Sequence, residues 1–198
     1  MIKAEAIDKV REDIITAAEE VFKKYGYLRV SMQDISKASG KGRSTLYYYF
    51  RNKMEVFDAV SHRLFSQLLK ECQKVISPEA TFVENIERYY TVKLRNLKKM
   101  ITQYELVAED LRQDPSLLAA KTTHKLQDNE IALLNNIIQW AQANNEIAQL
   151  STEDSMFLSE IFVTAFKSFE QEIVIYNKLQ NFEEKINWLV QILHKGLT

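Results

Sequence analysis

A short stretch near the N-terminus brings together positive charge, hydroxyl groups and aromatic rings. Between Lys41 and Lys53 there are four basic residues and no acidic residue. We expect a helix over Arg43–Phe50 in which Leu46 and Phe50, one turn apart, point inward. The outer face of this helix would then carry Arg43, Ser44, Thr45, Tyr47 and Tyr48. Cations and hydrogen-bond donors on an exposed helix suit DNA, because the phosphates attract the charges and the major groove accepts a helix.

A second short helix should precede this one. Ser31 and Asp34 form a capping-box pattern that predicts its start. Its buried side would consist of apolar residues at helical spacing, namely Met32, Ile35 and Ala38. Gly40 and Gly42 follow and predict a tight turn, because glycine adopts positive φ without a steric penalty. Two short helices joined by such a turn predict a helix-turn-helix.

An ordered pattern of residues runs from Arg11 to Lys53 and includes the letters T-L-Y-Y-Y-F at 45–50, followed by N-K at 52–53. Its members are Arg11, Ile14, Ala17, Ala18, Phe22, Gly26, Tyr27, Ser31, Met32, Ile35, Gly40, Thr45, Leu46, Tyr47, Tyr49, Phe50 and Lys53. The pattern resembles the N-terminal DNA-binding domain of the TetR family of one-component transcriptional regulators.

The resemblance implies which residues meet DNA. Those expected near bases are Gln33, Arg43, Ser44 and Tyr47, and those expected near phosphates are Lys41, Thr45, Tyr48 and Lys53. Arg43 could bind guanine through two hydrogen bonds, worth about 1 to 3 kcal/mol of discrimination. The chain departs from the family in the turn, where Lys41 and Gly42 replace a small apolar residue and a serine, and at Ser44, where glycine is frequent. These departures bear on the operator sequence more than on the fold.

Composition indicates an all-α protein. The 198 residues are 46% hydrophobic, with only 4 Gly and 2 Pro to interrupt helices. We expect about nine helices, from the start and stop signals along the chain. A three-helix DNA-binding head over residues 1–53 would continue directly into a larger effector-binding and dimerisation bundle over residues 54–198.

Charge is distributed unevenly although the net charge of the whole chain is only −1. Residues 1–53 contain 11 Lys and Arg against 7 Asp and Glu, whereas the remainder contains 15 against 20. A basic head on an acidic body is the distribution expected for a localised contact with DNA.

Start signals place most of the later helices. The pairs that mark helix starts are Asn52 with Glu55, Ser77 with Pro78, Asp114 with Pro115, Ser151 with Asp154, and Asn181 with Glu184. The first helix should run from about Ala6 to Tyr25 with an apolar stripe that includes Tyr25, and Gly26 should end it. The pattern over Glu79–Gln113 is too long for one average helix and should break near Leu97–Thr102.

The last two predicted helices are apolar on more than one side. The residues that fall outside their main stripes are Phe157, Phe166, Trp188 and Ile192. A helix with two apolar faces needs two surfaces against which to bury them. We therefore expect these residues to form the dimerisation surface of a homodimer, an arrangement that the family resemblance also implies.

The predicted middle helices are rich in aromatic and adaptable side chains that could line a small-molecule pocket. The effector-binding candidates are Phe65, Tyr89, Tyr90, Met100, Tyr104, His124 and Trp140, with Phe82 and Leu111 nearby. Ordinary core packing is the better interpretation for any one of them. A pocket is favoured by the resemblance, because members of the family commonly bind small effectors among the corresponding helices.

Several other functions are not supported by any motif. His62, His124 and His194 lie on separate predicted helices without metal-ligand spacing, and no nucleophile elbow, phosphate loop or cysteine cluster is present. Cys72 is the single cysteine and is expected to be a buried structural thiol. We expect no enzymatic activity, no cofactor and no metal. No apolar run approaches the roughly 18 residues of a membrane span, and the N-terminus lacks a signal-peptide core, so we expect a cytoplasmic protein without membrane contact.

Together with the family resemblance, these patterns predict a DNA-binding repressor that leaves a palindromic operator in double-stranded DNA when a small, largely apolar effector binds. An alternative is a DNA-anchored adaptor or architectural protein whose acidic body binds another protein. A closed, filled bundle would favour the adaptor, and an enclosed cavity with polar groups would favour the sensor.

Overall fold

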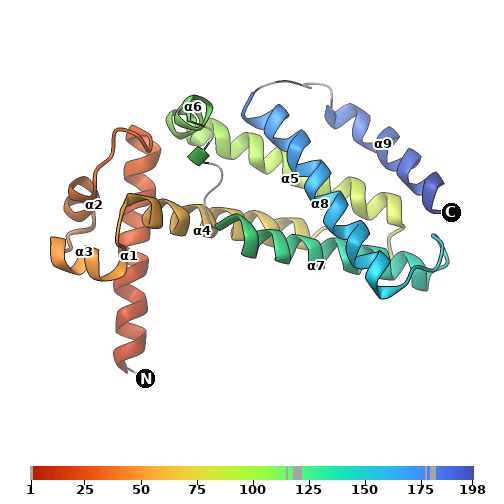
Figure 1. Cartoon of the computed structure of the whole chain (residues 1–198), viewed down its shortest axis with the longest axis horizontal. Coiled ribbons are helices and arrows are strands. Elements are labelled where there is room, and N and C mark those ends of the chain that lie inside the picture. The colour runs from red at the N-terminus through yellow and green to blue at the C-terminus, as the bar shows by residue number, and fades with distance from the viewer. Residues whose placement is uncertain (1, 115, 118–121, 177, 179–181) are drawn as a thin grey trace. The chain divides into compact units, whose positions relative to one another are not determined.

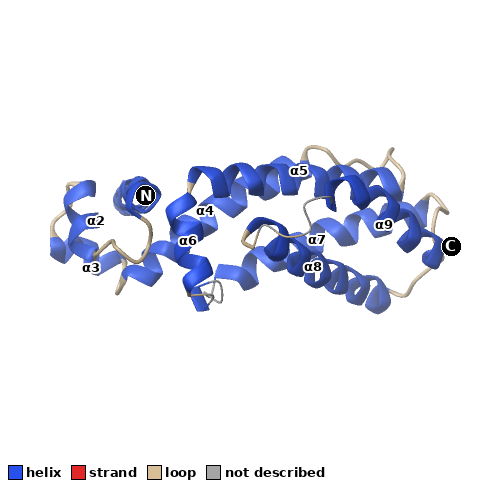
Figure 2. Ribbon diagram, turned by 90° about the horizontal axis from the view of Figure 1, so that it is seen from above, coloured by secondary structure: helices blue, strands red, loops and turns tan. Residues whose placement is uncertain are grey.

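In the part that it describes, the computed structural model of the chain consists of helices joined by loops (Figures 1 and 2). It describes the backbone of residues 2–114, 116–117, 122–176, 178 and 182–198, and the side chains of residues 9–114, 116–117, 126–173, 175–176, 178 and 185–198. The helices are α1 (Ile2–Tyr25), α2 (Met32–Ser39), α3 (Arg43–Tyr49), α4 (Lys53–Gln73), α5 (Phe82–Gln103), α6 (Glu105–Gln113), α7 (Thr122–Ala143), α8 (Thr152–Val174) and α9 (Phe182–Leu197). For these residues the prediction of an all-α fold with about nine helices is confirmed. None of the described helices is long and apolar enough to cross a membrane.

The chain forms two compact units. The first, here called the N-terminal unit, comprises Met1–Leu64 and Met100–Thr123, and the second, the C-terminal unit, comprises Phe65–Lys99 and His124–Thr198. The division by packing therefore falls inside α4 and α5. It differs from the functional division expected at residue 53, because α6 packs with α1 in the N-terminal unit.

Local sequence signals account for α2 and its turn. The Ser31 hydroxyl accepts a hydrogen bond from the Asp34 amide, and the Asp34 carboxylate accepts one from the Ser31 amide at 2.9 Å, so the predicted capping box is confirmed. Gly40 ends α2 with a φ of 64°, in the left-handed region that favours glycine. Gly42 has a φ of −61°, which any residue adopts, so the expectation that the turn needs two flexible glycines is wrong.

The core of the N-terminal unit joins α1 to the helix-turn-helix. Its most deeply buried members are Ile14, Ile15, Ala18, Phe22, Ile35, Leu46, Phe50, Val56 and Val60. The Phe22 and Phe57 rings meet edge to face at a centroid distance of 5.5 Å. The centroid of the Tyr27 ring lies 4.8 Å from that of the Phe57 ring. Tyr25 is 48% exposed and does not join the stripe of α1 as expected, because α1 ends there and Gly26 redirects the chain.

A carboxylate from α6 holds the turn that follows α1. The Oδ2 atom of Asp110 accepts hydrogen bonds from the Tyr27 amide at 2.6 Å and from the Leu28 amide at 2.9 Å. The preceding residue, Gly26, has a φ of 79°, and a Cβ added there would lie 2.6 Å from the same Oδ2 atom. At the N-terminal end of α6, the Tyr104 hydroxyl donates to Glu19 of α1 at 2.7 Å. A carboxylate that accepts from two backbone amides, one in a buried and one in a partly buried hydrogen bond, stabilises the turn.

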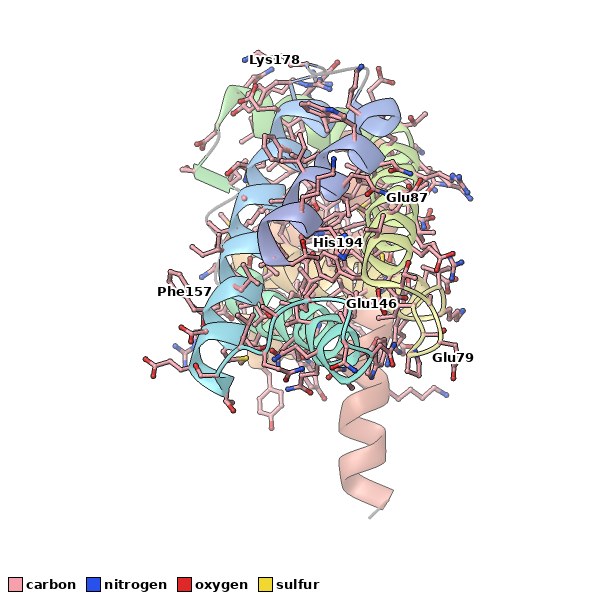
Figure 3. The ribbon with its side chains drawn as sticks, turned by 90° about the vertical axis from the view of Figure 1, so that its right-hand side faces the viewer. Glu79, Glu87, Glu146, Phe157, Lys178 and His194 are labelled. Atoms are coloured by element: carbon pink, nitrogen blue, oxygen red, sulfur yellow. The ribbon has the colours of Figure 1, made fainter. Side chains whose placement is uncertain are left out.

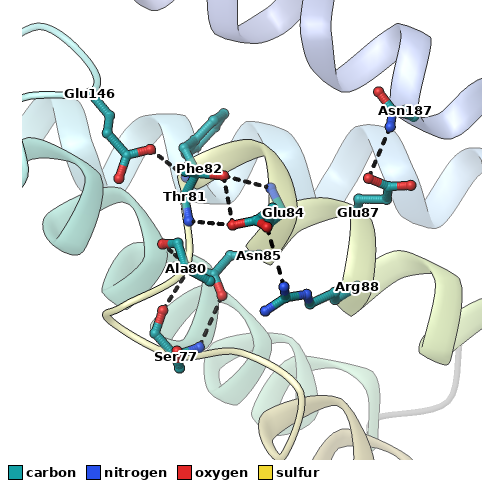
Figure 4. Close-up of polar contacts among 10 residues, drawn as sticks. All are labelled: Ser77, Ala80, Thr81, Phe82, Glu84, Asn85, Glu87, Arg88, Glu146 and Asn187. Atoms are coloured by element: carbon teal, nitrogen blue, oxygen red, sulfur yellow. Dashed lines mark hydrogen bonds and ion pairs between the residues drawn. The ribbon is translucent and has the colours of Figure 1, made fainter.

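The start of α5 differs from its prediction (Figure 4). Ser77 and Pro78 do not open a helix, because the Asn85 amide group bonds the Ser77 and Ala80 carbonyls and its oxygen accepts from the Ser77 amide, which folds residues 77–80 into a turn. Thr81 caps α5 instead, in a reciprocal pair of bonds with Glu84. A threonine followed by glutamate three residues later is the stronger start signal here.

The other helix boundaries can be compared with their predicted positions. Ser151 caps α8 by accepting from the Asp154 amide at 3.0 Å, as predicted. The break in the long pattern falls at Tyr104, just beyond the expected interval. Asp114 ends α6 and does not start α7, because its carboxylate bonds Ser116 in a turn. Pro115 and Asn181 lie outside the described residues, and so does the Glu184 side chain.

Substituting Gly26 with alanine should destabilise the N-terminal unit. Alanine is strained at this φ, and its Cβ would displace the Asp110 carboxylate from two amides, so we expect a loss of about 2 kcal/mol or more in the free energy of unfolding. Urea denaturation followed by circular dichroism measures the change. The matched control is Gly196→Ala in α9, where an added Cβ meets no atom within 4 Å and the helix gains a better helix former. Equal denaturation midpoints for the two variants would contradict the role of Asp110.

Candidate nucleic-acid interface

The exposed face of α3 carries polar and aromatic side chains on a buried base. Leu46 and Phe50 are 0% and 3% exposed, whereas Tyr47 and Tyr48 are 41% and 75% exposed. Arg43 and Ser44 are also exposed, and Thr45 is half-buried. A helix of seven residues is too short to be stable alone, so the inward residues hold α3 on the core and leave the outward ones available.

Contacts along α3 orient its outward side chains. The Arg43 guanidinium lies 5.6 Å from the centroid of the Tyr47 ring, one turn further on. The Tyr48 and Tyr49 rings meet edge to face at 5.0 Å. This arrangement offers guanidinium and hydroxyl donors from the start and middle of the helix, as direct reading of base edges in a major groove requires.

Lys41 is tied into the turn before α3. Its ammonium is 2.9 Å from Asp13 Oδ2 on α1, and its carbonyl accepts a hydrogen bond from the Ser36 hydroxyl at 2.7 Å. The hydrogen bond from Lys41 lowers the pKa of the Asp13 carboxyl below its ordinary value. The ion pair is largely exposed, so a phosphate could compete with Asp13 for the ammonium at little cost. Gln33 lies exposed on α2.

Lys53 has a structural role that the sequence did not reveal. Its ammonium donates to the Tyr27 carbonyl at 2.7 Å, lies 3.4 Å from the Leu28 carbonyl and sits 4.2 Å from the centroid of the Tyr27 ring. Burial lowers the pKa of Lys53 from its ordinary value. Asp110 therefore binds the backbone amides of the turn at Tyr27 and Leu28, and Lys53 binds the carbonyls of the same turn. The expected contact of Lys53 with phosphate stays a prediction.

The effector-binding candidates are divided between the two units. Met100 and Tyr104 pack against the core of the N-terminal unit. Tyr89 and Tyr90 are fully buried in the C-terminal unit, where Phe65 is 38% exposed and Trp140 is half-buried. His124 lies in α7, and its side chain is outside the described residues.

The dimerisation candidates separate into exposed and buried residues. Phe157 and Trp188 are each 62% exposed, Ile192 is 47% exposed, and Figure 3 shows Phe157 on the outer side of α8. Phe166 is only 3% exposed, because its ring stacks on Tyr90 inside the C-terminal unit. Placing Phe166 on the outer face is therefore wrong. Helical spacing alone cannot tell an inward from an outward side when a helix is apolar on both.

Polar groups that sequence reasoning missed are brought together by tertiary packing. Lys93 of α5 is buried between Glu130 of α7 and Glu170 of α8. These residues are far apart in sequence, and the only available signal was charged residues at positions that face the core by helical spacing. Among the described residues, no three His, Cys, Asp and Glu side chains are placed to hold a metal ion.

Comparison with known proteins finds similarity to bacterial regulators. The family model described as "Bacterial regulatory proteins, tetR family" matches residues 14–60. The chain is 31% identical over 75 residues to the uncharacterized HTH-type transcriptional regulator YhgD of Bacillus subtilis (strain 168), a match covering 38% of this chain and 39% of that protein. It is 24% identical over 146 residues to the HTH-type transcriptional repressor NicS of Pseudomonas putida, covering 72% and 68% of the two chains. A TetR-family transcriptional regulator from Pectobacterium atrosepticum has the same fold, with a TM-score of 0.70 and 17% identity over 98% of this chain and 96% of that one.

Removing the Arg43 side chain should weaken binding to a specific duplex and relax its sequence preference. The duplex is obtained by selecting a random DNA library with the wild-type protein, and affinity is measured by fluorescence anisotropy. We expect Arg43→Ala to lose about 1 to 3 kcal/mol, the value of a two-bond contact with a base. Arg88→Ala is the control, since it removes a positive charge from another exposed position, on α5. If both variants bind the duplex equally, α3 does not read bases through Arg43.

Proposed function

Since the chain belongs to the TetR family of DNA-binding transcriptional regulators, we propose that it is a homodimeric repressor released from a palindromic operator by a small, largely apolar effector. The observation that carries the proposal is α3, which exposes Arg43, Tyr47 and Tyr48 from a buried support. Membership of a family of transcriptional regulators confirms the expectation that the chain is not an enzyme.

The proposed operator contact uses two copies of α3. Arg43, Ser44, Tyr47 and Gln33 would meet bases, and Lys41, Thr45, Tyr48 and Lys53 would meet phosphates. In a two-fold symmetric dimer the two α3 helices would enter successive major grooves, about 34 to 36 Å apart along the duplex. A palindromic operator follows from that symmetry.

The proposed dimer surface consists of the exposed apolar residues Phe157, Ile161, Trp188 and Ile192 on α8 and α9. A group of large apolar side chains on neighbouring helices is unfavourable in water and marks an interaction surface. Packing of this surface against the same surface of a second copy would remove the apolar side chains from water. It would also fix the distance between the two α3 helices of the dimer.

Release by an effector would be a shift between two populated conformations. A ligand that binds one conformation of the C-terminal unit more tightly favours that conformation. Because α4 contributes residues to both units, it can carry the change toward α3. NicS is named a repressor, which supports the same sign of regulation here. A cytoplasmic location belongs to this proposal, since the operator would lie in the bacterial chromosome.

Charge placed in the proposed dimer surface should separate the protomers and weaken operator binding. We expect Trp188→Glu to sediment as a monomer. It should also bind the selected duplex at least 100-fold more weakly, because one protomer alone contacts only half of the operator. Analytical ultracentrifugation and anisotropy at low salt measure the two effects. Gln139→Glu adds the same charge at an exposed position of α7 and should leave both unchanged. A wild-type protein that is monomeric, or that fails to select any duplex, would overturn the proposal.

A further inference from the structure

A buried ion cluster lies among three helices of the C-terminal unit. The Lys93 ammonium from α5 is 2.7 Å from Glu170 Oε1 on α8 and also contacts Glu130 Oε1 on α7. The Tyr89 hydroxyl donates to the same Glu130 oxygen at 2.9 Å. The side chains of Lys93, Glu130 and Glu170 are 5%, 11% and 12% exposed. All three charged groups are thus nearly removed from water.

The charges of this cluster do not balance. Two carboxylates share one ammonium, so the cluster carries a surplus negative charge when both are ionised. Charge buried without a partner is costly. Burial is the main cause that raises the pKa of Glu170, to about 7, against the opposing effect of Lys93.

The groups that act on Glu170 come from four helices. Lys93 and Tyr90 come from α5, Glu130 comes from α7, Cys72 comes from α4, and Lys167 lies on α8 itself. Tyr89, also on α5, acts on Glu130. Burial raises the pKa of Cys72 to about 12 and keeps the thiol neutral. Tyr89 and Tyr90 are also kept neutral, because burial raises their pKa values well above the ordinary value. Within this set, Lys93 and Lys167 are the cations, and only Lys93 makes an ion pair with Glu170.

An aromatic wall beside the cluster carries an unused polar group. The Tyr90 hydroxyl is buried and has no hydrogen-bond partner among the described residues, although buried hydroxyls almost always have one. The Tyr90 ring stacks on Phe166 at a centroid distance of 3.7 Å and meets Tyr89 edge to face at 5.0 Å. Lys93 Nζ lies 5.9 and 6.0 Å from the centroids of Tyr90 and Tyr89, so both rings border the charged groups. Aromatic faces attract cations, and an unpartnered hydroxyl offers an acceptor.

We propose that Glu130, Glu170 and Tyr90 form a binding site for an organic cation, a protonated amine with an apolar body. The ammonium supplies the second positive charge that the two carboxylates lack. Because Tyr89 and Tyr90 are fully buried and Phe166 stacks on the Tyr90 ring, the apolar body enters by displacing side chains from that ring. This inference rests on the proposed function, because it assigns a chemical class to the effector. A neutral molecule of the same shape brings no such charge and binds more weakly.

Uptake of the cation is coupled to loss of a proton. At a pH below about 7 the Glu170 carboxyl is protonated and the cluster is already neutral, so the amine must displace that proton. At higher pH Glu170 is ionised and no proton has to leave. Affinity for the amine therefore increases as the pH rises from 6 to 8, while the amine itself stays protonated.

The test compares phenylalkylamines of two to five methylene groups with the alcohols of the same lengths. Binding to the full chain is measured by isothermal titration calorimetry at pH 6 and pH 8. We expect at least one amine to bind tenfold or more tightly than its alcohol at pH 8 and more weakly at pH 6. Glu170→Gln, which keeps the side-chain size, should lose this preference, and Tyr90→Phe should weaken amine binding several-fold with the fold retained. The control Glu172→Gln, on the same helix with an exposed partner in Lys178, should bind as the wild type does.

Two outcomes overturn the cation site. In the first, no amine binds better than its alcohol, and the cluster then titrates as a proton site only. In the second, Glu170→Gln and Tyr90→Phe both bind amines as the wild type does. Fluorescence anisotropy of the selected duplex measures DNA binding and release. It therefore distinguishes failure of the cation site from failure of the proposed function. Release of DNA by neutral alcohols alone would refute the cation site and would support the proposed repressor function. Amine binding without any operator binding would support the cation site and refute the repressor function.

Discussion

The burial of Leu46 and Phe50 in the core of the N-terminal unit is the constraint on which the candidate interface depends. A helix of seven residues has too few internal hydrogen bonds to persist alone, so α3 exists because its inward side chains are buried in a core shared with Phe22, Ile35 and Val56. That burial uses one face of α3 and fixes what the opposite face presents. Arg43, Tyr47 and Tyr48 are therefore displayed by a rigid support, which a reader of base edges requires.

Buried charges organise both units in different ways. In the N-terminal unit, Asp110 bonds the amides of the turn after α1 and Lys53 bonds its carbonyls, so opposite charges stabilise one short segment. In the C-terminal unit, Lys93 is outnumbered by Glu130 and Glu170. The first arrangement is satisfied and gives stability. The second is unbalanced, and such an imbalance is typical of a site that binds something.

Local rules account for much of the fold, because they act over a few residues. The capping box at Ser31, the N-cap at Ser151 and the left-handed glycine at position 40 are visible in the sequence alone. The start of α5 was mispredicted, since the Asn85 side chain, and not the Ser77–Pro78 pair, decides where the chain turns. The bonds of Asp110 join residues more than 80 positions apart, and no local pattern predicts them. Exposure of α3 was predicted well, whereas the inward position of Phe166 depended on tertiary packing.

The central claim is that α3 and the turn before it contact DNA. It is tested most directly by recording amide chemical shifts of the labelled protein while a selected duplex is added. The account predicts that the largest changes fall on residues 41–49, with smaller ones at Gln33 and along the first turns of α1. Changes concentrated in α7 and α8, with residues 41–49 unaffected, would contradict it.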